Sequence, residues 1–527
     1  MLIELLLVAV MRSHPPVAFM DSSRMIDSQP VVPPQSLSMA SQEPLVKDIR
    51  TKASHASGAE TGPQSWILSG TCKYRETDEQ FELAFGSRLR FKNSVIGPLQ
   101  LIFGFDGQKC WGLNWSGVAH YVDIGNAKYN ELLNWIISGN WSLPASPISI
   151  EKAVRDSDDY DLTITLPTDR ISARLIVSQK TMLPVSLSYR ADSGDETWEF
   201  DGYQRFSSRT FPTQILDKMP GQTDTYTILS AKQTKTVDST FELPHVQGSN
   251  AAFDSRVNAS VDIKSIGGYM FVKPKVDGKE SGWFFLDTGA EVMCIDPKLA
   301  NDLGAKVMGH EVTSGVVATI NLPICRTNSF SLGPITLSHP TFLELDMSSF
   351  TKAFGIEISG ICGYDFLAHA ILDIDPIGSK LTLYQKAVSN LPDGLAWQPI
   401  KFSGQIPCSA CEFDQKNSGV FSLDTGSGST VDFYSPTVAR LSMASNRPTT
   451  KAQTGGAGGS TESLTVTIDS FVLGGHRFDH PEVGLQTTKT GVFASSFLDG
   501  NVGMGLMSHF RMILDYPQSR MAFIWEK

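Results

Sequence analysis

Two Asp-Thr-Gly triplets are the residues of this 527-residue chain whose type and context best suit chemistry. Asp287 occurs in FFLDTGAEV and Asp424 in FSLDTGSGS, each directly after an apolar run that predicts a buried strand. Each triplet adds a hydroxyl that can bond to nearby backbone and a glycine that permits a tight turn: Thr288, Gly289, Thr425 and Gly426. We therefore expect each strand end to hold its aspartate rigidly and partly out of water.

Two such aspartates brought face to face would form an acid–base pair. Adjacent carboxylates cannot easily both ionise, so the pair shares one proton. One carboxylate can then activate a water molecule as a base, while the other protonates an attacked carbonyl oxygen as an acid. This chemistry hydrolyses an amide without a covalent intermediate, a metal or a cofactor. The alternative is a pair of the same fold that has lost its activity.

The sequence around the two triplets is repeated. Four blocks recur in the same order, 137–141 residues apart: Asp287 with Asp424, residues 330–340 with 471–481, Gly363 with Gly503, and Asp375 with Asp515. A repeat at nearly one offset predicts two copies of one structural unit. We expect two β-rich lobes, residues 263–390 and 391–527, related by a pseudo-two-fold axis that brings the aspartates together.

Residues 61–245 carry short alternating runs of apolar and polar residues broken by Gly, Asp and Pro. This pattern predicts an antiparallel β domain, with one helix around residues 126–138. The segment contains no cluster of His, Cys or carboxylate residues that suggests chemistry. Residues 246–262 are predicted to be a linker to the repeated lobes.

The N-terminal segment and the overall charge limit the classes of partner. The chain has 44 basic and 55 acidic residues, a formal net charge of -11, and no basic stripe, which excludes a nucleic-acid binder. The opening run MLIELLLVAVM is about half as long as a membrane span. It suits an export signal, so we expect residues 1–60 to be a signal and disordered linker of a periplasmic or extracellular protein. A cytoplasmic location is the alternative.

Cysteines and histidines show no pattern of metal ligands. Cys408 and Cys411 are the only close pair among seven cysteines, and they are expected to form a hairpin disulfide or two buried thiols. A zinc site would need two further ligands at similar spacing. His310, His339 and His480 lack such spacing, and the last two belong to a His-Pro pair that recurs in both lobes, which favours a structural turn.

Residues 263–527 resemble the retropepsin and pepsin class of aspartic proteases. The resemblance rests on the two triplets, extended to Ala290 and Ser427, and on a later element of each lobe that ends in Gly363 or Gly503. The short lobes are similar to bacterial retropepsin-like lobes, here fused in a single chain. The resemblance implies that Asp287 and Asp424 are the catalytic pair.

The resemblance also assigns supporting roles around this pair. Thr288 and Thr425 would interlock across the axis, and the elements at Gly363 and Gly503 would lie beneath the active-site loops. Ser427 would orient the Asp424 carboxylate, which Ala290 cannot do for Asp287. Asn501 stands where the first lobe has Ile361, so the second supporting element is less apolar.

Enzymes of this class close a hairpin, the flap, over the bound peptide. Each lobe has a glycine-containing candidate beyond its aspartate: residues 307–320 with Gly315, and residues 451–464 with Gly456 and Gly458. Neither candidate contains the tyrosine that pepsin-like enzymes place over the pair.

The domain at residues 61–245 resembles the half-barrel of periplasmic lipoprotein carriers. The similar residues are the W-x-L-S-G opening at 66–70 and the turn GFDGQKCW at 104–111. The resemblance implies an apolar groove for a lipid or peptide, and a packing or spacer domain is the alternative.

The sequence therefore predicts a mainly β protein, with an antiparallel half-barrel-like domain followed by two acid-protease β-barrel lobes. The predicted function is an aspartic endopeptidase that acts as a monomer on extended peptides. One alternative is a catalytically silent peptide- or lipid-binding protein. Another retains catalysis but pairs lobes from two chains.

Overall fold

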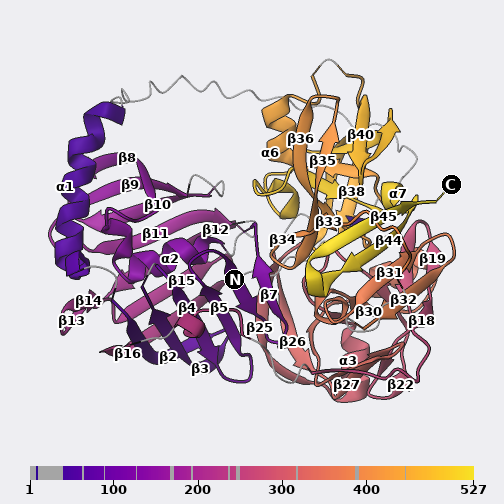
Figure 1. The fold of residues 1–527 in the computed structure, drawn as a ribbon, viewed down its shortest axis with the longest axis horizontal. Helices are drawn as coiled ribbons and strands as arrows, with labels where there is room; N and C mark the ends of the chain where they lie inside the picture. The colour runs from indigo at the N-terminus through magenta and orange to yellow at the C-terminus, as the bar shows by residue number, and fades with distance from the viewer. Residues whose placement is uncertain are drawn as a thin grey trace, which may run out of the picture.

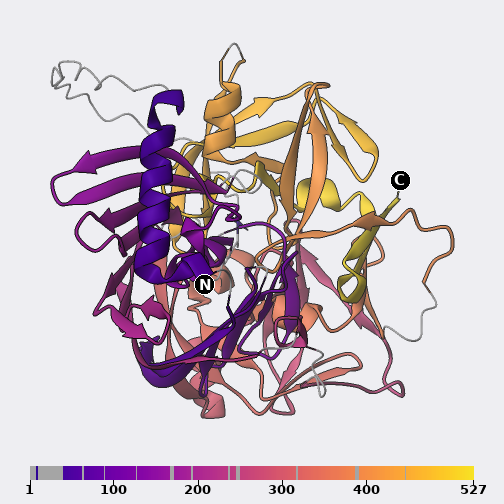
Figure 2. The same ribbon diagram turned by 60° about the vertical axis from the view of Figure 1, so that its left-hand side comes forward.

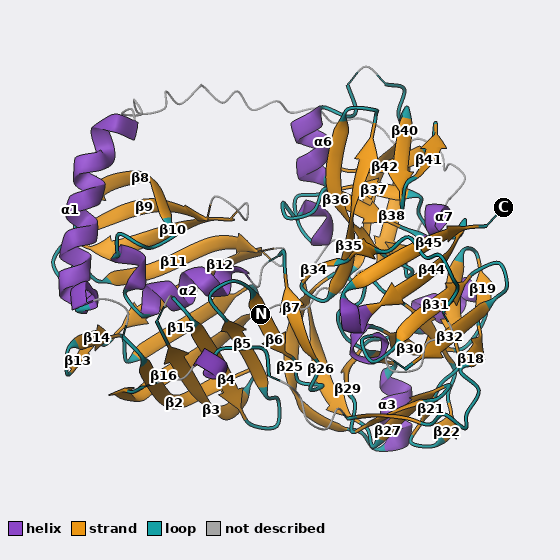
Figure 3. Ribbon diagram, in the orientation of Figure 1, coloured by secondary structure: helices purple, strands orange, loops and turns teal. Residues whose placement is uncertain are grey.

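The computed structural model describes most of the chain. The described residues are 8–9, 39–61, 64–87, 89–125, 128–166, 171–191, 194–235, 238–244, 250–315, 319–385, 391–445 and 447–526. Strands dominate in both halves of the molecule, with helices at the margins of the sheets (Figure 3). The predicted mainly β fold is confirmed, and the sheets among the described residues are open rather than closed barrels.

The N-terminal half is built on one 13-stranded antiparallel sheet, on the left of Figure 1. In spatial order its strands are β7 (Ala119–Val122), β6 (Cys110–Leu113), β5 (Leu101–Phe105), β4 (Phe91–Ile96), β3 (Thr77–Phe85), β2 (Trp66–Tyr74), β16 (Gln222–Gln233), β15 (Gln214–Met219), β12 (Gly194–Asp201), β11 (Pro184–Ala191), β10 (Ile171–Ser178), β9 (Asp159–Leu166) and β8 (Ser149–Asp156). Alternation gives β9 one buried face, since every second side chain is buried. A small hairpin of β13 (Gln204–Phe206) and β14 (Arg209–Phe211) adjoins the sheet.

Two helices contribute to the core of this sheet. The apolar helix α2 (Tyr129–Ile137) confirms the helix predicted around 126–138. Helix α1 (Met39–Ser57) lies in front of the sheet in Figure 2 and packs through Ile49 and Ala53. The prediction of a linker up to residue 60 is wrong for this segment, because a one-turn spacing of two small apolar contacts leaves a weak periodic signal. No helix among the described residues is long and apolar enough to cross a membrane.

Residues from 250 onward form four further sheets, on the right of Figure 1. An eight-stranded sheet contains β19 (Lys264–Ile266), β20 (Tyr269–Val272), β23 (Trp283–Leu286), β30 (Ile358–Cys362), β24 (Cys294–Ile295), β29 (Thr341–Glu344), β26 (Thr319–Arg326) and β25 (Lys306–Ser314). A five-stranded sheet contains β17 (Ala251–Phe253), β28 (Ile335–Ser338), β27 (Ser329–Leu332), β21 (Lys275–Val276) and β22 (Lys279–Glu280).

The C-terminal part has an 11-stranded sheet. Its strands are β1 (Val8–Ala9), β38 (Thr450–Gly456), β39 (Gly459–Thr467), β42 (Glu482–Gln486), β37 (Val431–Phe433), β43 (Gly500–Val502), β36 (Asn417–Leu423), β35 (Ile406–Phe413), β40 (Ser470–Leu473) and β41 (His476–Asp479), with β34 (Lys401–Ser403) on β35. The short helices around these sheets are α3 (Pro297–Leu303), α4 (Ser348–Phe354), α5 (Tyr364–Leu367), α6 (Ser435–Leu441) and α7 (Met504–Met507).

A six-stranded sheet joins the two parts that carry the triplets. Its order is β18 (Ser260–Asp262), β32 (Lys380–Tyr384), β31 (Ile371–Asp375), β44 (Phe510–Asp515), β45 (Arg520–Trp525) and β33 (Gln398–Pro399). Strands β31 and β44 pair antiparallel at its centre, with Ile371 opposite Asp515. The backbone ladder therefore fixes how the two triplet-bearing parts face each other.

The predicted linker at 246–262 belongs in part to these sheets. Strand β17 pairs with β28, and β18 pairs with β32. Residues 246–249 lie outside the described residues. Short edge strands join a sheet through backbone hydrogen bonds, so they need no alternating side-chain pattern.

Candidate active site

Asp287 and Asp424 meet at the ends of two equivalently placed strands. Asp287 follows β23, which runs parallel to β30, and Asp424 follows β36, which runs parallel to β43. Their backbone N–H groups donate to Cys362 O at 3.1 Å and to Val502 O at 3.0 Å. The two carboxyl groups are in hydrogen-bonding contact, and both residues are fully buried.

The glycines of the triplets make this close approach feasible. A Cβ on Gly289 would lie 2.5 Å from Cγ of Asp424, and one on Gly426 would lie 2.4 Å from Cγ of Asp287. Each glycine also donates its N–H to Oδ1 of the aspartate in its own triplet, at 2.8 Å. Any larger residue at either position would displace the opposite carboxyl group.

The threonines interlock across the junction, as the resemblance implied. The Thr288 N–H donates to Oγ1 of Thr425, and the Thr425 N–H donates to Oγ1 of Thr288, both at 3.0 Å. Each hydroxyl then donates to the opposite strand end, to Leu423 O at 2.6 Å and to Leu286 O at 2.7 Å. These buried reciprocal bonds fix the relative position of the two aspartates.

Burial dominates the electrostatics of the pair. It raises the pKa of Asp287 to about 7, against hydrogen bonds from Asp424 and from the backbone of Gly289 and Gly426 that lower the pKa. Burial raises the pKa of Asp424 still further, and the negative charge of Asp287 adds to that rise. The pair therefore holds a proton between two carboxyl groups, which acid–base chemistry requires.

The side chain that orients Asp424 is Asn501, and the prediction that Ser427 does so is wrong. Asn501 donates from Nδ2 to Oδ2 of Asp424 at 3.2 Å, and its Oδ1 accepts from Ser422 at 2.8 Å. The Ser427 hydroxyl instead bonds to that of Ser429, at 2.8 Å. The substitution of Asn501 for Ile361 between the repeated blocks was the available signal, and the sequence analysis read it only as a loss of apolar character.

Gly363 and Gly503 lie beneath the loops that follow the aspartates, as predicted. A Cβ on Gly363 would come within 2.3 Å of Val292 O, and one on Gly503 within 2.5 Å of Ser429 O. The next N–H groups, of Tyr364 and Met504, donate to Ala290 O and Ser427 O at 2.9 and 2.7 Å. Thus Ala290 and Ser427 support the site through their backbone carbonyl groups.

The N-terminal sheet also contacts this supporting layer. Asn114 and Ser116 donate to the two carboxylate oxygens of Asp365 in α5, at 2.6 and 2.8 Å. Burial raises the pKa of Asp365 to about 7, although these two hydrogen bonds lower it. Sequence reasoning did not find this contact, because its partners are far apart in the chain.

Both predicted flap segments form hairpins. In the first, β25 pairs with β26, and Gly315 accepts a backbone hydrogen bond from Val492 at 3.2 Å. Residues 316–318 lie outside the described residues. Gly315 therefore links the first hairpin to the part of the chain that carries Asp424.

The second hairpin pairs β38 with β39, and its tightest pair is Gly456 with Gly459. Gly458 has φ +86°, which glycine adopts readily at a two-residue turn. At the tip, Ala457 is buried in the hydrophobic cluster that contains Ala290 and Val292. Each hairpin therefore reaches toward the opposite triplet-bearing part. The outer edge of β38 pairs with β1, Val8 opposite Gly456.

Cysteines and histidines take structural positions. Cys408 and Cys411 are buried in β35 and form no disulfide, since residues three apart in a strand face opposite sides. His339 and His480 both have φ +52° and occupy equivalent turns, as predicted. His310 pairs with Glu76 at 3.0 Å. Within the described part of the chain, no group of three or more His, Cys, Asp or Glu residues could hold a metal ion.

Comparisons with known proteins support one part of this site. The family model for aspartyl proteases matches residues 272–366, which include Asp287 and Gly363. The chain therefore contains an aspartyl-protease-like domain. A search of curated proteins finds no match.

Two solved structures are weakly similar to the N-terminal part. A LolA superfamily protein from Nitrosomonas europaea is 14% identical, with 37% of this chain and 97% of that chain covered and a TM-score of 0.28. A DUF1329 family protein from Desulfovibrio piger is 10% identical, with 38% and 96% covered and a TM-score of 0.27. At these TM-scores the likeness does not define the fold of the N-terminal half.

Proposed function

We propose that the chain is an aspartic endopeptidase that hydrolyses peptide bonds with a water molecule held between Asp287 and Asp424. The observation that carries this proposal is the contact of two buried carboxyl groups whose pKa values are both raised. The family match at residues 272–366 supports the same reaction class.

The proton of the pair lies on Asp424 in this mechanism, because Asp424 has the higher pKa. Ionised Asp287 accepts a proton from the water, and the resulting hydroxide attacks the carbonyl carbon of the scissile peptide bond. Asp424 donates its proton to the carbonyl oxygen at the same time. The product is a neutral gem-diol, with the proton of the pair now on Asp287.

Collapse of the gem-diol completes the reaction. Asp424 takes back a hydroxyl proton as the carbonyl group reforms, and Asp287 donates its proton to the leaving nitrogen. The C–N bond breaks, the products are a carboxylic acid and an amine, and the pair returns to its starting protonation. Hydrogen bonds from Gly289 and Gly426 hold the carboxyl groups in place throughout.

The substrate would bind as an extended strand under the two hairpins, through backbone hydrogen bonds. The pairing of β1 with β38 supports this mode, since it places a strand on the edge of the second hairpin. Both aspartates are 0% exposed, so at least one hairpin must move before a peptide enters.

Several finer assignments belong to the same proposal. Residues 263–390 and 391–527 would be two copies of one lobe, so that one chain carries the complete site and acts as a monomer. Sedimentation at the mass of one chain would support this arrangement, and activity confined to a dimer would contradict it. We also propose that the protein is exported and that residues 61–245 hold a lipid or peptide.

Cleavage of a mixed peptide library from about pH 3 to about pH 8, with Asp287→Asn as the control, tests the function. We expect cleavage at discrete sites, a bell-shaped dependence on pH, and no activity in the variant. Absence of cleavage by folded protein at every pH would contradict the proposal.

A catalytically silent peptide-binding protein is the second candidate, and the complete burial of both aspartates favours it. Titration of the pair separates the two candidates. A carboxyl group that titrates well above 4 while the protein binds and cleaves peptide supports the enzyme. Tight binding of an intact peptide without cleavage supports the silent protein.

A further inference from the structure

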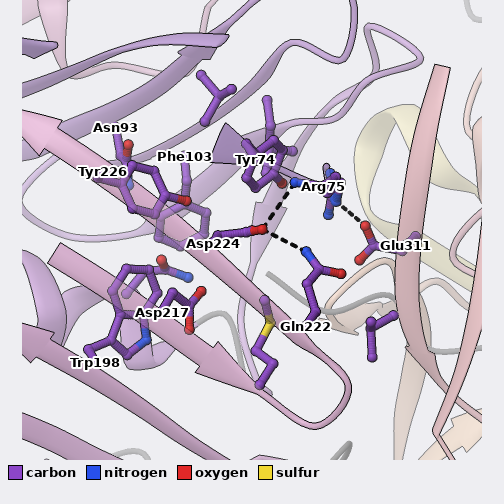
Figure 4. A pocket seen from close by; sticks show the side chains of 15 residues that line it. Tyr74, Arg75, Asn93, Phe103, Trp198, Asp217, Gln222, Asp224, Tyr226 and Glu311 are labelled. Atoms are coloured by element: carbon purple, nitrogen blue, oxygen red, sulfur yellow. Dashed lines mark hydrogen bonds and ion pairs between the residues drawn. The ribbon is translucent and has the colours of Figure 1, made fainter. Parts of the chain in front are cut away.

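A small cavity lies between the N-terminal sheet and the first hairpin. Its volume is about 40 Å³, enough for a few non-hydrogen atoms. Tyr74 at the end of β2, Asp217 on β15 and Asp224 on β16 line it from the sheet, and Glu311 and Val312 on β25 close the other side (Figure 4).

Carboxyl groups outnumber basic groups in this cavity. Asp217, Asp224 and Glu311 line it together with one guanidinium group, that of Arg75. Arg75 forms a buried ion pair with Glu311. The backbone N–H of Arg75 and the amide of Gln222 both donate to Oδ1 of Asp224, at 3.1 and 2.8 Å. Arg75 and Gln222 therefore serve Glu311 and Asp224.

Asp217 differs from the other two acids. It is only 3% exposed, and its Oδ1 has no hydrogen-bond partner among the described residues. Its nearest polar neighbour is another acid, Glu196, which accepts from Tyr189 at 2.5 Å and from Trp198 at 2.8 Å. A buried carboxyl oxygen without a donor costs free energy unless a ligand or water supplies one.

Two further polar atoms of the lining lack partners. They are the hydroxyl oxygen of Tyr74, a residue 5% exposed, and Oδ1 of Asn93. Together with Oδ1 of Asp217, they make three oxygens able to accept hydrogen bonds. The rings of Trp198 and Tyr226, which stack with centroids 6.0 Å apart, also line the cavity. Aromatic faces attract cations.

We propose that this cavity binds a primary ammonium group, the protonated end of a small amine or of a lysine side chain. Such a group has three N–H donors, no acceptor and one positive charge. These properties match three acceptor oxygens, an excess of carboxyl groups and the aromatic faces. The volume admits the ammonium group with its first carbon atom and excludes a bulky ligand.

Binding would also affect the first hairpin, a consequence that rests on the proposed function. Glu311 and Val312 belong to β25, so a ligand in the cavity contacts the sheet and the hairpin at once. A ligand that bridges two elements stabilises their docked arrangement. Amine binding would then restrain one of the two hairpins that cover the aspartates.

Calorimetric titration of the full chain with ethylammonium chloride tests the proposal. The Asp287→Asn protein is used so that peptide cleavage plays no part, and sodium chloride holds ionic strength constant. We expect saturable binding at one site and a melting temperature that rises with ligand concentration. Asp217→Asn should weaken binding about tenfold, since a charge-assisted hydrogen bond is lost. Asp78→Asn, an exposed acid on β3, should leave it unchanged.

Further arms distinguish the source of the amine and the alternatives. Tighter binding of a blocked lysine peptide than of ethylammonium would identify a polypeptide lysine as the ligand, and the reverse order a free amine. Val312→Leu fills the cavity without a charge change and should also abolish binding. Equal binding of potassium, no saturable binding, or binding unaffected by Asp217→Asn would overturn the proposal. Because the proteins tested are inactive, these outcomes do not depend on proteolysis.

Discussion

Asn501 donates a hydrogen bond to Asp424, whereas the equivalent residue on the other side of the pair, Ile361, has no polar side-chain atom. The two aspartates are therefore alike in backbone setting and different in side-chain environment. A donor beside a carboxylate favours its ionised form and lowers its pKa. Asn501 thus opposes the burial that holds a proton on Asp424.

Replacement of Asn501 by leucine should move the pH profile of activity upward. The substitution removes the only side-chain amide donor to Asp424 given by the described residues, so the pKa of the pair rises by roughly one unit. The measurement is kcat/KM across pH for the parent and the variant. Asn501→Asp is a second variant: it adds a carboxyl group beside the pair and should shift the profile further in the same direction. A profile identical to that of the parent would show that Asn501 only packs.

The Asp287→Asn substitution should stabilise the fold at neutral pH. The pKa of Asp287 is about 7 in the folded protein and near 3.8 in the unfolded chain, so the folded state binds the proton more tightly. The parent is fully stable below about pH 4 and loses stability as pH rises toward about 7. An uncharged amide avoids this loss, which amounts to roughly 3 kcal/mol.

Urea unfolding at two pH values measures this effect. The variant should exceed the parent in free energy of unfolding at about pH 8 and match it near pH 4. Asp78→Asn, which changes an exposed acid, is the control and should show no comparable difference. A variant less stable than the parent at the higher pH would mean that Asp287 is not held protonated by burial.

Replacement of Thr425 by valine should destabilise the junction of the two triplets. The Thr425 hydroxyl donates to Leu286 O and accepts from the N–H of Thr288, and valine leaves both buried groups without a partner. Each unpaired group costs about 1–3 kcal/mol, so we expect a loss of roughly 2–5 kcal/mol in unfolding free energy, together with most of the activity. Thr71→Val, on an exposed face of β2, is the matched control. A stable variant with full activity would exclude a role for the interlock.

The sequence pattern predicted what local patterns and repeats encode, and it failed where a role depends on sheet register. Apolar strands ending in Asp-Thr-Gly, and the repeat that unites them, announced the pair. The contact of Asn501 with Asp424 arises because β43 pairs in parallel with β36, and no local signal reports that register. The contact of Arg75 with Glu311 joins distant parts of the chain, so it too was invisible. Helix α1 was missed because its buried stripe is narrow and Pro44 lies inside it.

The ion pair between Arg75 and Glu311 should control the docking of the first hairpin. Both side chains are nearly fully buried, and Arg75 also stacks on the rings of Tyr74 and Trp115, at 4.5 and 4.6 Å. Glu311→Gln leaves a buried guanidinium charge without its counter-charge, which costs about 3–5 kcal/mol. We therefore expect a marked loss of stability and faster proteolytic nicking of β25 by an added protease.

The neighbouring pair of Glu76 with His310 provides the matched control. It joins the same turn to the same strand, but its side chains are 60% and 37% exposed. Exposed ion pairs contribute about 0–1 kcal/mol, so Glu76→Gln should leave stability and nicking nearly unchanged. If the proposed function holds, only Glu311→Gln should change the KM for peptides, because only it frees the hairpin that covers the aspartates. Equal effects of the two substitutions would show that burial of the ion pair does not hold the hairpin.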